Sequence, residues 1–92
     1  MIAPDFEAAT RACYETLREG WKGGHHAKWL SSFEKHVFPR IGTKPVDRVD
    51  SACVVEALSP IWLEIPETAR RILQRISVVL DYAHIKGWVP EE

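Results

Sequence analysis

Cysteine is scarce in this sequence, and its placement argues against the folds that depend on it. Only Cys13 and Cys53 are present; they are forty positions apart, and neither has a Cys-x-x-Cys partner. This spacing disfavours a disulfide framework and a zinc site built on cysteine pairs. Both cysteines occupy positions where apolar residues are expected, so we predict two reduced thiols in the core.

Long hydrophobic runs are also missing. No apolar stretch approaches the roughly 18 residues that a membrane-spanning helix requires, and residues 1–10 have neither the basic start nor the apolar stretch of a signal peptide. The sequence therefore predicts a cytoplasmic protein without a membrane partner.

The residue patterns of enzymes and metal sites are absent as well. The four histidines, His25, His26, His36 and His84, form no His-x3-His pair, and neighbouring side chains on a helix diverge by about 100°. No serine, cysteine or carboxylate lies beside a histidine at a spacing that suggests a prepared nucleophile, and no glycine-rich phosphate loop occurs. We therefore expect no catalytic residue, no metal and no cofactor.

What the sequence does contain is enough apolar surface for one folded domain. Its 92 residues are 46% hydrophobic and 27% charged, with four tryptophans and three phenylalanines, a length at which a single core becomes self-sufficient. We expect one domain over residues 1–92. Apolar residues recur at helical spacing, whereas no two-residue alternation persists. The pattern predicts an all-α, four-helix fold.

Start and stop signals delimit the four predicted helices. Their expected ranges are about 5–19, 25–37, from Asp50 onward, and 66–87. Asp5 and Asp50 are candidate N-caps, and Pro60 is expected to bend or end the third helix. Residues 38–49, between the second and third helices, contain two prolines and a glycine, which predicts an ordered but irregular connection.

The fourth helix carries the clearest pattern. On a helical wheel its apolar residues fall within an arc of about 120°, the width of a core-facing stripe. They are Ala69, Ile72, Leu73, Ile76, Val79, Leu80 and Ala83. Thr68, Arg71 and Arg75 flank this arc, whereas Arg70 lies on the opposite, solvated side.

The net charge of −1 argues by itself against a nucleic-acid-binding protein. Its distribution along the chain changes that interpretation. Residues 20–48 contain six basic and two acidic side chains, and residues 70–86 contain four basic and one acidic, whereas residues 49–69 contain four acidic and no basic ones. If the fold places the two basic segments side by side, they form a local positive face.

The first candidate binding site is the flank of the fourth helix that carries Thr68, Arg71 and Arg75. A hydroxyl and two guanidinium groups near the positive end of a helix dipole suit a phosphate group. In the alternative interpretation, both arginines cover the edge of the core and pair with neighbouring carboxylates. The candidate partners are Glu56, Glu64 and Glu67.

The second candidate site is the start of the second helix. It comprises the basic residues Lys22, His25, His26 and Lys28, with Trp21 and Trp29 interleaved. Cations, backbone amides and an aromatic surface at a helix start suit a nucleic-acid backbone. Alternatively, Trp29 is a core residue and the histidines are solvated. Further basic residues extend the positive charge along the chain or only keep the surface soluble; they are Lys35, Arg40, Lys44 and Arg48.

Several short motifs follow one another in a characteristic order. They are Trp21-Lys22, His26, Trp29-Leu30, Phe38-Pro39-x-Ile41-Gly42, Pro45-Val46, Leu58-x-Pro60-Ile61-Trp62, Glu67-Thr68-Ala69-Arg70, Arg75-Ile76 and Leu80-Asp81-Tyr82-Ala83. This order resembles the core-binding, SAM-like domain of tyrosine-type site-specific recombinases, close to the integrases of prophages and genomic islands. The resemblance covers almost the whole chain, and the tract 38–83 is its most specific part.

The resemblance implies a small helical DNA-binding domain that precedes a catalytic domain, the two closing around the duplex as a C-shaped clamp. It implies two partners, double-stranded DNA of the core attachment site and other integrase protomers, in the cytoplasm and nucleoid of a bacterium. The family's DNA-facing surface corresponds to the two candidate sites, to which we add Lys44. The catalytic groups belong to a downstream domain that is absent from this chain, so neither Tyr14 nor Tyr82 is expected to be the nucleophile.

A helical protein–protein interaction module without DNA binding is the alternative function. Trp21, Trp62 and Trp88 lie near predicted helix ends, where large aromatic side chains often anchor interfaces or close the core. The two functions differ in their salt dependence, because added salt weakens phosphate contacts but not an aromatic anchor.

Overall fold

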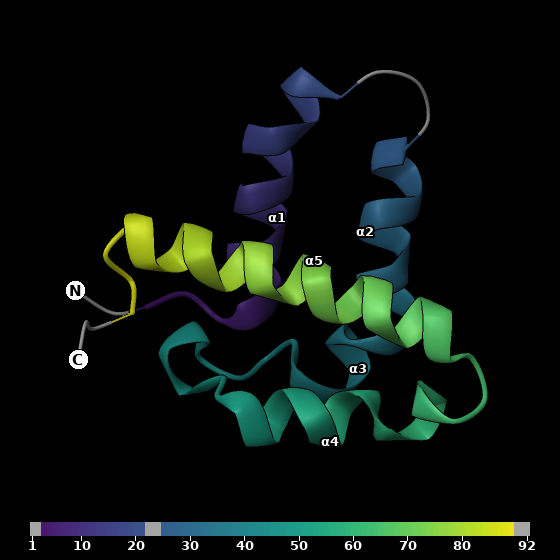
Figure 1. Ribbon diagram of the computed structural model, residues 1–92. Helices are drawn as coiled ribbons and strands as arrows, with labels where there is room; N and C mark the ends of the chain where they lie inside the picture. The colour runs from purple at the N-terminus through teal and green to yellow at the C-terminus, as the bar shows by residue number, and fades with distance from the viewer. Residues whose placement is uncertain (1–2, 22–24, 90–92) are drawn as a thin grey trace.

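The computed structural model describes residues 3–21 and 25–89, without the side chains of His25 and His26. The described chain is helical and contains no strand (Figure 1), which confirms the all-α prediction. Its elements in chain order are α1 (Phe6–Leu17), η1 (Arg18–Gly20), α2 (His25–His36), α3 (Phe38–Ile41), η2 (Val46–Arg48), α4 (Ser51–Trp62) and α5 (Pro66–Ile85), where η denotes a 3-10 helix.

The longest helix, α5, packs against the other long helices. It crosses in front of α1 and α2, and α4 runs beneath it as the other arm of a helical hairpin (Figure 1). The inner face of α5 buries Ala69, Ile72, Ile76, Val79 and Ala83. These are five of the seven residues in the predicted stripe. Leu80 is half-buried and Leu73 is 36% exposed, so the prediction of Leu73 as a core residue was wrong.

The connection over residues 38–49 is more regular than predicted, because it contains α3 and η2. Pro39 occupies the first turn of α3, where a backbone N–H is not needed for the helix. The backbone N–H of Phe6 donates to the carbonyl of Lys44 at 2.8 Å, which ties this segment to the start of α1. The described chain therefore has a fifth, short α-helix in addition to the four predicted ones.

Pro60 lies inside α4 and does not end it, since the helix continues to Trp62. A proline at this position cannot donate to the carbonyl of Glu56 one turn earlier. The hydroxyl of Ser59 donates to that carbonyl instead, at 2.9 Å. The carbonyl of Glu56, which lacks the usual backbone donor four residues later, is thus still hydrogen-bonded.

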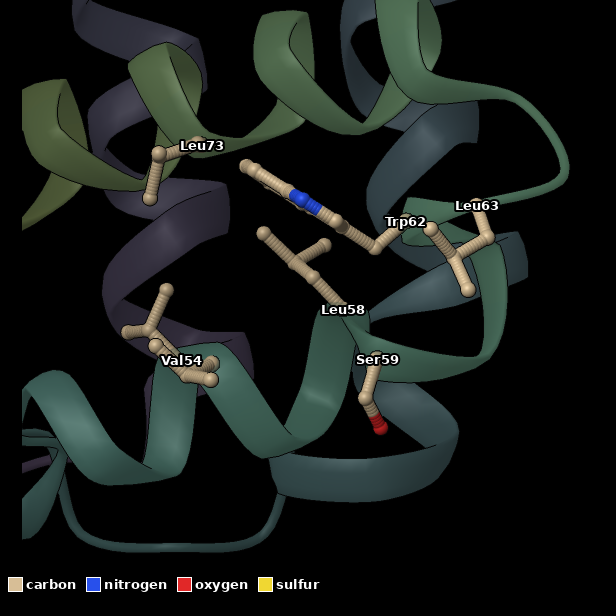
Figure 2. A pocket seen from close by; sticks show the side chains of 7 residues that line it. Val54, Leu58, Ser59, Trp62, Leu63 and Leu73 are labelled. Atoms are coloured by element: carbon tan, nitrogen blue, oxygen red, sulfur yellow. The ribbon is translucent and has the colours of Figure 1, made fainter.

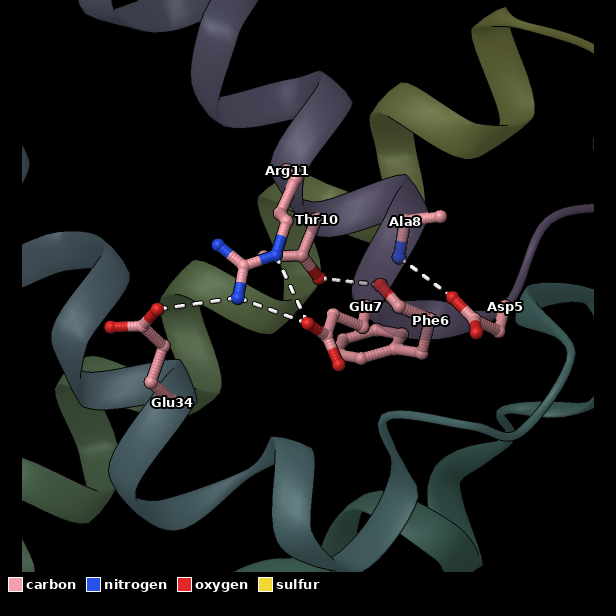
Figure 3. Close-up of polar contacts among 7 residues, drawn as sticks. All are labelled: Asp5, Phe6, Glu7, Ala8, Thr10, Arg11 and Glu34. Atoms are coloured by element: carbon pink, nitrogen blue, oxygen red, sulfur yellow. Dashed lines mark hydrogen bonds and ion pairs between the residues drawn. The ribbon is translucent and has the colours of Figure 1, made fainter.

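Figure 3 shows polar contacts within α1 and one between α1 and α2. Asp5 caps α1, as predicted, by accepting from the backbone N–H of Ala8 at 2.8 Å. Arg11 forms ion pairs with Glu7 on its own helix (2.9 Å) and with Glu34 on α2 (3.2 Å). Its hydrogen bonds and charge interactions with these carboxylates, that with Glu7 first, raise the pKa of Arg11. Arg11 is therefore a structural arginine with two counter-ions.

Both cysteines are free, but only Cys13 belongs to the core. Cys13 is fully buried, and burial raises the pKa of its thiol to about 11. Cys53 is half-buried at the start of α4, where its thiol donates to the carbonyl of Arg48 at 3.8 Å. The prediction of a second core thiol was therefore wrong.

An aromatic cluster joins the end of α1 to α2. Trp29 is only 8% exposed, and its ring centroid lies 5.5 Å from that of Trp21, 6.1 Å from that of Tyr14 and 4.8 Å from that of Phe33. Trp29 is therefore a core residue, as in the alternative interpretation of its sequence context. The cluster sets the position of α2 relative to α1.

Candidate nucleic-acid interface

Thr68, Arg71 and Arg75 lie along one flank of the first half of α5, and we call them the α5 ridge. Spacings of three and four residues place them on one side of the helix. Thr68 and Arg75 are half-buried, and Arg71 is exposed. The Nη1 of Arg75 donates to the Oγ of Ser32 on α2 at 2.9 Å. The α5 ridge therefore borders α2, and parts of the two basic segments meet.

The arginines of the α5 ridge have no acidic partner among the described residues. The ion pairs in this part of the chain involve Arg11 and Arg18 instead. The structure thus does not form the pairs with glutamates of residues 49–69 that the alternative interpretation requires. Burial lowers the pKa of Arg75, and the positive charge of Arg71 lowers it further. Arg71 and Arg75 are thus two neighbouring like charges, one of them partly desolvated. Glu67 lines a hollow together with Arg71 but forms no ion pair with it.

Of the candidate residues at the start of α2, the structure places the side chain of Lys28. Lys22 lies outside the described residues, and so do the side chains of His25 and His26, whose backbone begins α2. Lys28 is exposed and lies four residues before Ser32, on the same face of α2. It is therefore on the side of α2 that receives Arg75.

Lys44 lies beside the start of α4. There a hydrogen bond with Cys53 and, more weakly, the charge of Asp50 raise its pKa. The contacts of Lys44 are thus with the start of α4, whereas Arg75 of the α5 ridge contacts α2.

A separate apolar groove lies between α4 and α5 (Figure 2), and we call it the α4/α5 groove. It has a volume of about 530 Å³ and is lined by Val54, Val55, Leu58, Ser59, Trp62, Leu63 and Leu73. Trp62 is 42% exposed, and its indole extends over Leu58 toward Leu73. No described side chain fills the groove, which is why Leu73 is exposed at its wall. Trp62 thus borders an open apolar surface, whereas Trp21 and Trp88 are half-buried.

The described residues form neither a metal cluster nor a membrane span. They include no group of three or more His, Cys, Asp or Glu side chains placed to hold a metal ion. No helix among them is long and apolar enough to cross a bilayer. A second, more polar hollow of about 230 Å³ lies on α5 and is lined by Glu67, Arg70, Arg71 and Gln74.

The helical fold and its sequence define a domain of the integrase class. Residues 6–92 match the family described as the phage integrase central domain. Because the match covers nearly the whole chain, this protein belongs to that family, and the resemblance to tyrosine recombinase core-binding domains is confirmed. The central domain is a non-catalytic portion of an integrase.

One solved structure is similar to this chain over most of its length. It is the solution NMR structure of protein Nmul_A0922 from Nitrosospira multiformis, with a TM-score of 0.87 and 31% sequence identity. The similarity covers 96% of this chain and 84% of that chain. No curated protein matches the sequence.

Ser32 joins α2 to the α5 ridge but is not among the site residues that the sequence predicts. It carries no charge and no apolar side chain, so neither the charge count nor the helical pattern singles it out. The signal that was available is its spacing, because Ser32 follows Lys28 by four residues and shares its face. Its partner Arg75 is 43 positions away in the chain, a separation that no local pattern reveals.

Proposed function

We propose that this protein binds double-stranded DNA as the central domain of a tyrosine-type site-specific recombinase of a phage or genomic island. It holds the core recombination site through backbone phosphates, alongside other protomers, while a separate C-terminal domain cuts and rejoins the strands. It acts in the bacterial cytoplasm, at the nucleoid. The observation that carries the proposal is the α5 ridge, where two neighbouring arginines have no acidic partner among the described residues.

Each residue of the α5 ridge has a defined role in this proposal. Arg71 and Arg75 neutralise phosphate charge, and Thr68 donates a hydrogen bond from the first turn of α5, where the helix dipole favours an anion. Lys28 on α2 binds a neighbouring phosphate. Further contacts are proposed for Lys22, His25 and His26. Phosphate contacts position the duplex but read no sequence, so binding through them alone is non-specific.

Titration of a fluorescent duplex at several salt concentrations tests the proposal. About four phosphate contacts predict a slope of about −0.9 per contact in log affinity against log salt, with dissociation constants of about 10⁻⁴ to 10⁻⁶ M at physiological salt. The double variant Arg71→Ala/Arg75→Ala should bind every duplex roughly tenfold more weakly and flatten the slope by about two contacts. Unchanged affinity and slope would remove the α5 ridge from the interface.

Arg70→Ala is the matched control for Arg71→Ala, since it removes the same charge from the same helix. Arg70 lines a hollow together with Arg71, but its side chain leaves the helix about 100° away from that of Arg71 and about 140° away from that of Arg75. Arg70→Ala should leave the slope close to that of the original chain, whereas Arg71→Ala should reduce it by about one contact. An equal loss in the two single variants would show that only the total charge of α5 matters, and would refute a defined ridge.

Docking of another protein is the second candidate function, and the α4/α5 groove is the observation that favours it. A groove lined by Leu58, Trp62 and Leu63 is suited to the apolar face of an amphipathic helix. Salt separates the two functions, because association through this groove should persist from low to moderate ionic strength, where phosphate contacts weaken steeply.

A further inference from the structure

The hydroxyl of Ser32 connects α2 to the guanidinium of Arg75. It donates a hydrogen bond to the carbonyl of Trp29 at 2.8 Å and accepts one from the Nη1 of Arg75 at 2.9 Å. A serine has a single hydroxyl proton, and here it is committed to the carbonyl of Trp29. The oxygen lone pairs therefore face Arg75, and the hydroxyl acts as a fixed acceptor for the guanidinium.

Arg75 differs from the structural arginine of this fold. Arg11 is held by two carboxylates, whereas the acceptor that the structure gives Arg75 is the neutral hydroxyl of Ser32. A guanidinium has five N–H donors, so one bond to Ser32 leaves most of its N–H groups available for a ligand. Arg71 lies one turn earlier on the same face, within reach of a shared ligand. A partly buried cation beside a second cation favours an anion between them.

We infer that Ser32 is a positioning residue, whose hydroxyl holds the Arg75 guanidinium in the orientation in which Arg75 and Arg71 together bind one backbone phosphate of the duplex. The inference rests on the DNA binding proposed above. A free arginine loses rotamer freedom when it binds a ligand, and this loss weakens affinity. In this protein Arg75 loses its rotamer freedom on folding, because Ser32 already holds its guanidinium in place before DNA binds.

Removal of the Ser32 hydroxyl has an expected signature that differs from removal of Arg75. Ser32→Ala should lower DNA affinity roughly three- to tenfold at every salt concentration and leave the salt slope unchanged, since Arg75 still reaches the phosphate. Arg75→Ala should lower affinity and also flatten the slope by about 0.9. Ser32→Thr retains a hydroxyl and should bind like the original chain.

Ser31→Ala is the matched control on the same helix. The hydroxyl of Ser31 donates to the carbonyl of Lys28 at 3.3 Å, so its loss should leave affinity unchanged. Alanine is a strong helix former, so Ser32→Ala should keep α2 intact, as measured by circular dichroism and Tm. If it does not fold, Ser32→Cys, which keeps the shape but supplies only a weak acceptor, should show the same loss of affinity.

The double variant Ser32→Ala/Arg75→Ala decides between positioning and a general structural effect. If Ser32 acts through Arg75, the double variant binds like Arg75→Ala alone. The inference is overturned if Ser32→Ala binds like Ser31→Ala, or if it causes the same loss with and without Arg75. If the original chain shows no salt-dependent DNA affinity, the proposed function fails and the inference with it. If Ser32→Ala leaves DNA affinity unchanged while Arg75→Ala lowers it, the proposed function stands and the inference alone fails.

Discussion

At the scale of single residues, arginine side chains have two different surroundings in this domain. The carboxylates of Glu7 and Glu34 raise the pKa of Arg11, whereas burial and the charge of Arg71 lower that of Arg75. A count of charges along the chain treats these arginines alike. Their difference depends on neighbours brought together by folding, which is why the sequence predicts basic segments but not which arginines in them lack a counter-ion.

The two thiols should differ in reactivity. The thiolate is the reactive form, and burial raises the pKa of Cys13 to about 11, so Cys13 stays protonated and shielded at pH 8. Iodoacetamide should therefore label the folded protein once, on half-buried Cys53, and label the guanidinium-unfolded chain twice. Peptide mapping by mass spectrometry distinguishes the two sites. Labelling of Cys13 in the folded protein as fast as that of Cys53 would contradict the burial of Cys13.

At the scale of helices, the sequence predicts what depends on neighbours in the chain. The caps Asp5 and Asp50 mark the starts of α1 and α4 as expected. At Pro60, of the two outcomes that the sequence allows, an end of the helix is not seen, because α4 continues to Trp62. The prediction for Leu73 was wrong, since the open α4/α5 groove leaves it outside the core although its periodicity is that of a core residue.

Asp50 should stabilise α4 in a pH-dependent manner. Its carboxylate accepts from the backbone N–H of Cys53 at 2.9 Å, and this bond is the main cause of the lowered pKa of Asp50. Because the folded-state pKa lies below the unfolded one, the stabilisation is complete above the unfolded pKa and is lost as pH falls through the folded pKa. Asp50→Ala should lower Tm by roughly 5 °C at pH 7 and by less in acid.

Asp50→Asn provides the control for this cap. Asparagine is also a good N-cap but has no carboxyl group to titrate, so this variant should keep most of the Tm at pH 7 and lose the acid dependence at this site. Thermal unfolding followed by circular dichroism measures both effects. Equal losses of Tm in the two variants at pH 7 would show that the charge of Asp50, and not its cap hydrogen bond, stabilises α4.

At the scale of the whole molecule, a net charge of −1 coexists with a local cationic surface. The acidic segment 49–69 separates the basic segments in the chain, but the fold carries α5 across α2 (Figure 1) and joins them through Arg75 and Ser32. Charge counting predicts that two basic segments exist. Their junction requires the packing of α5 on α2, which no pattern within either segment encodes.

The α5 ridge and the α4/α5 groove should act independently, because they lie on opposite flanks of α5. Leu73 follows Arg71 by two positions, so their side chains point about 160° apart around the helix axis. Leu63, at the groove, is 90% exposed, and Leu63→Ser should change DNA affinity by less than about twofold and Tm by less than about 3 °C.

The double variant Leu63→Ser/Arg71→Ala tests this independence directly. Since distant sites without shared partners act additively, it should show the loss of DNA affinity of Arg71→Ala and no more, in titrations at one fixed salt concentration. Arg70→Ala with Leu63→Ser supplies the charge-matched comparison. A clearly larger loss in Leu63→Ser/Arg71→Ala would place the groove in contact with the duplex or with a second protomer on it, and the two flanks of α5 would then form one continuous interface.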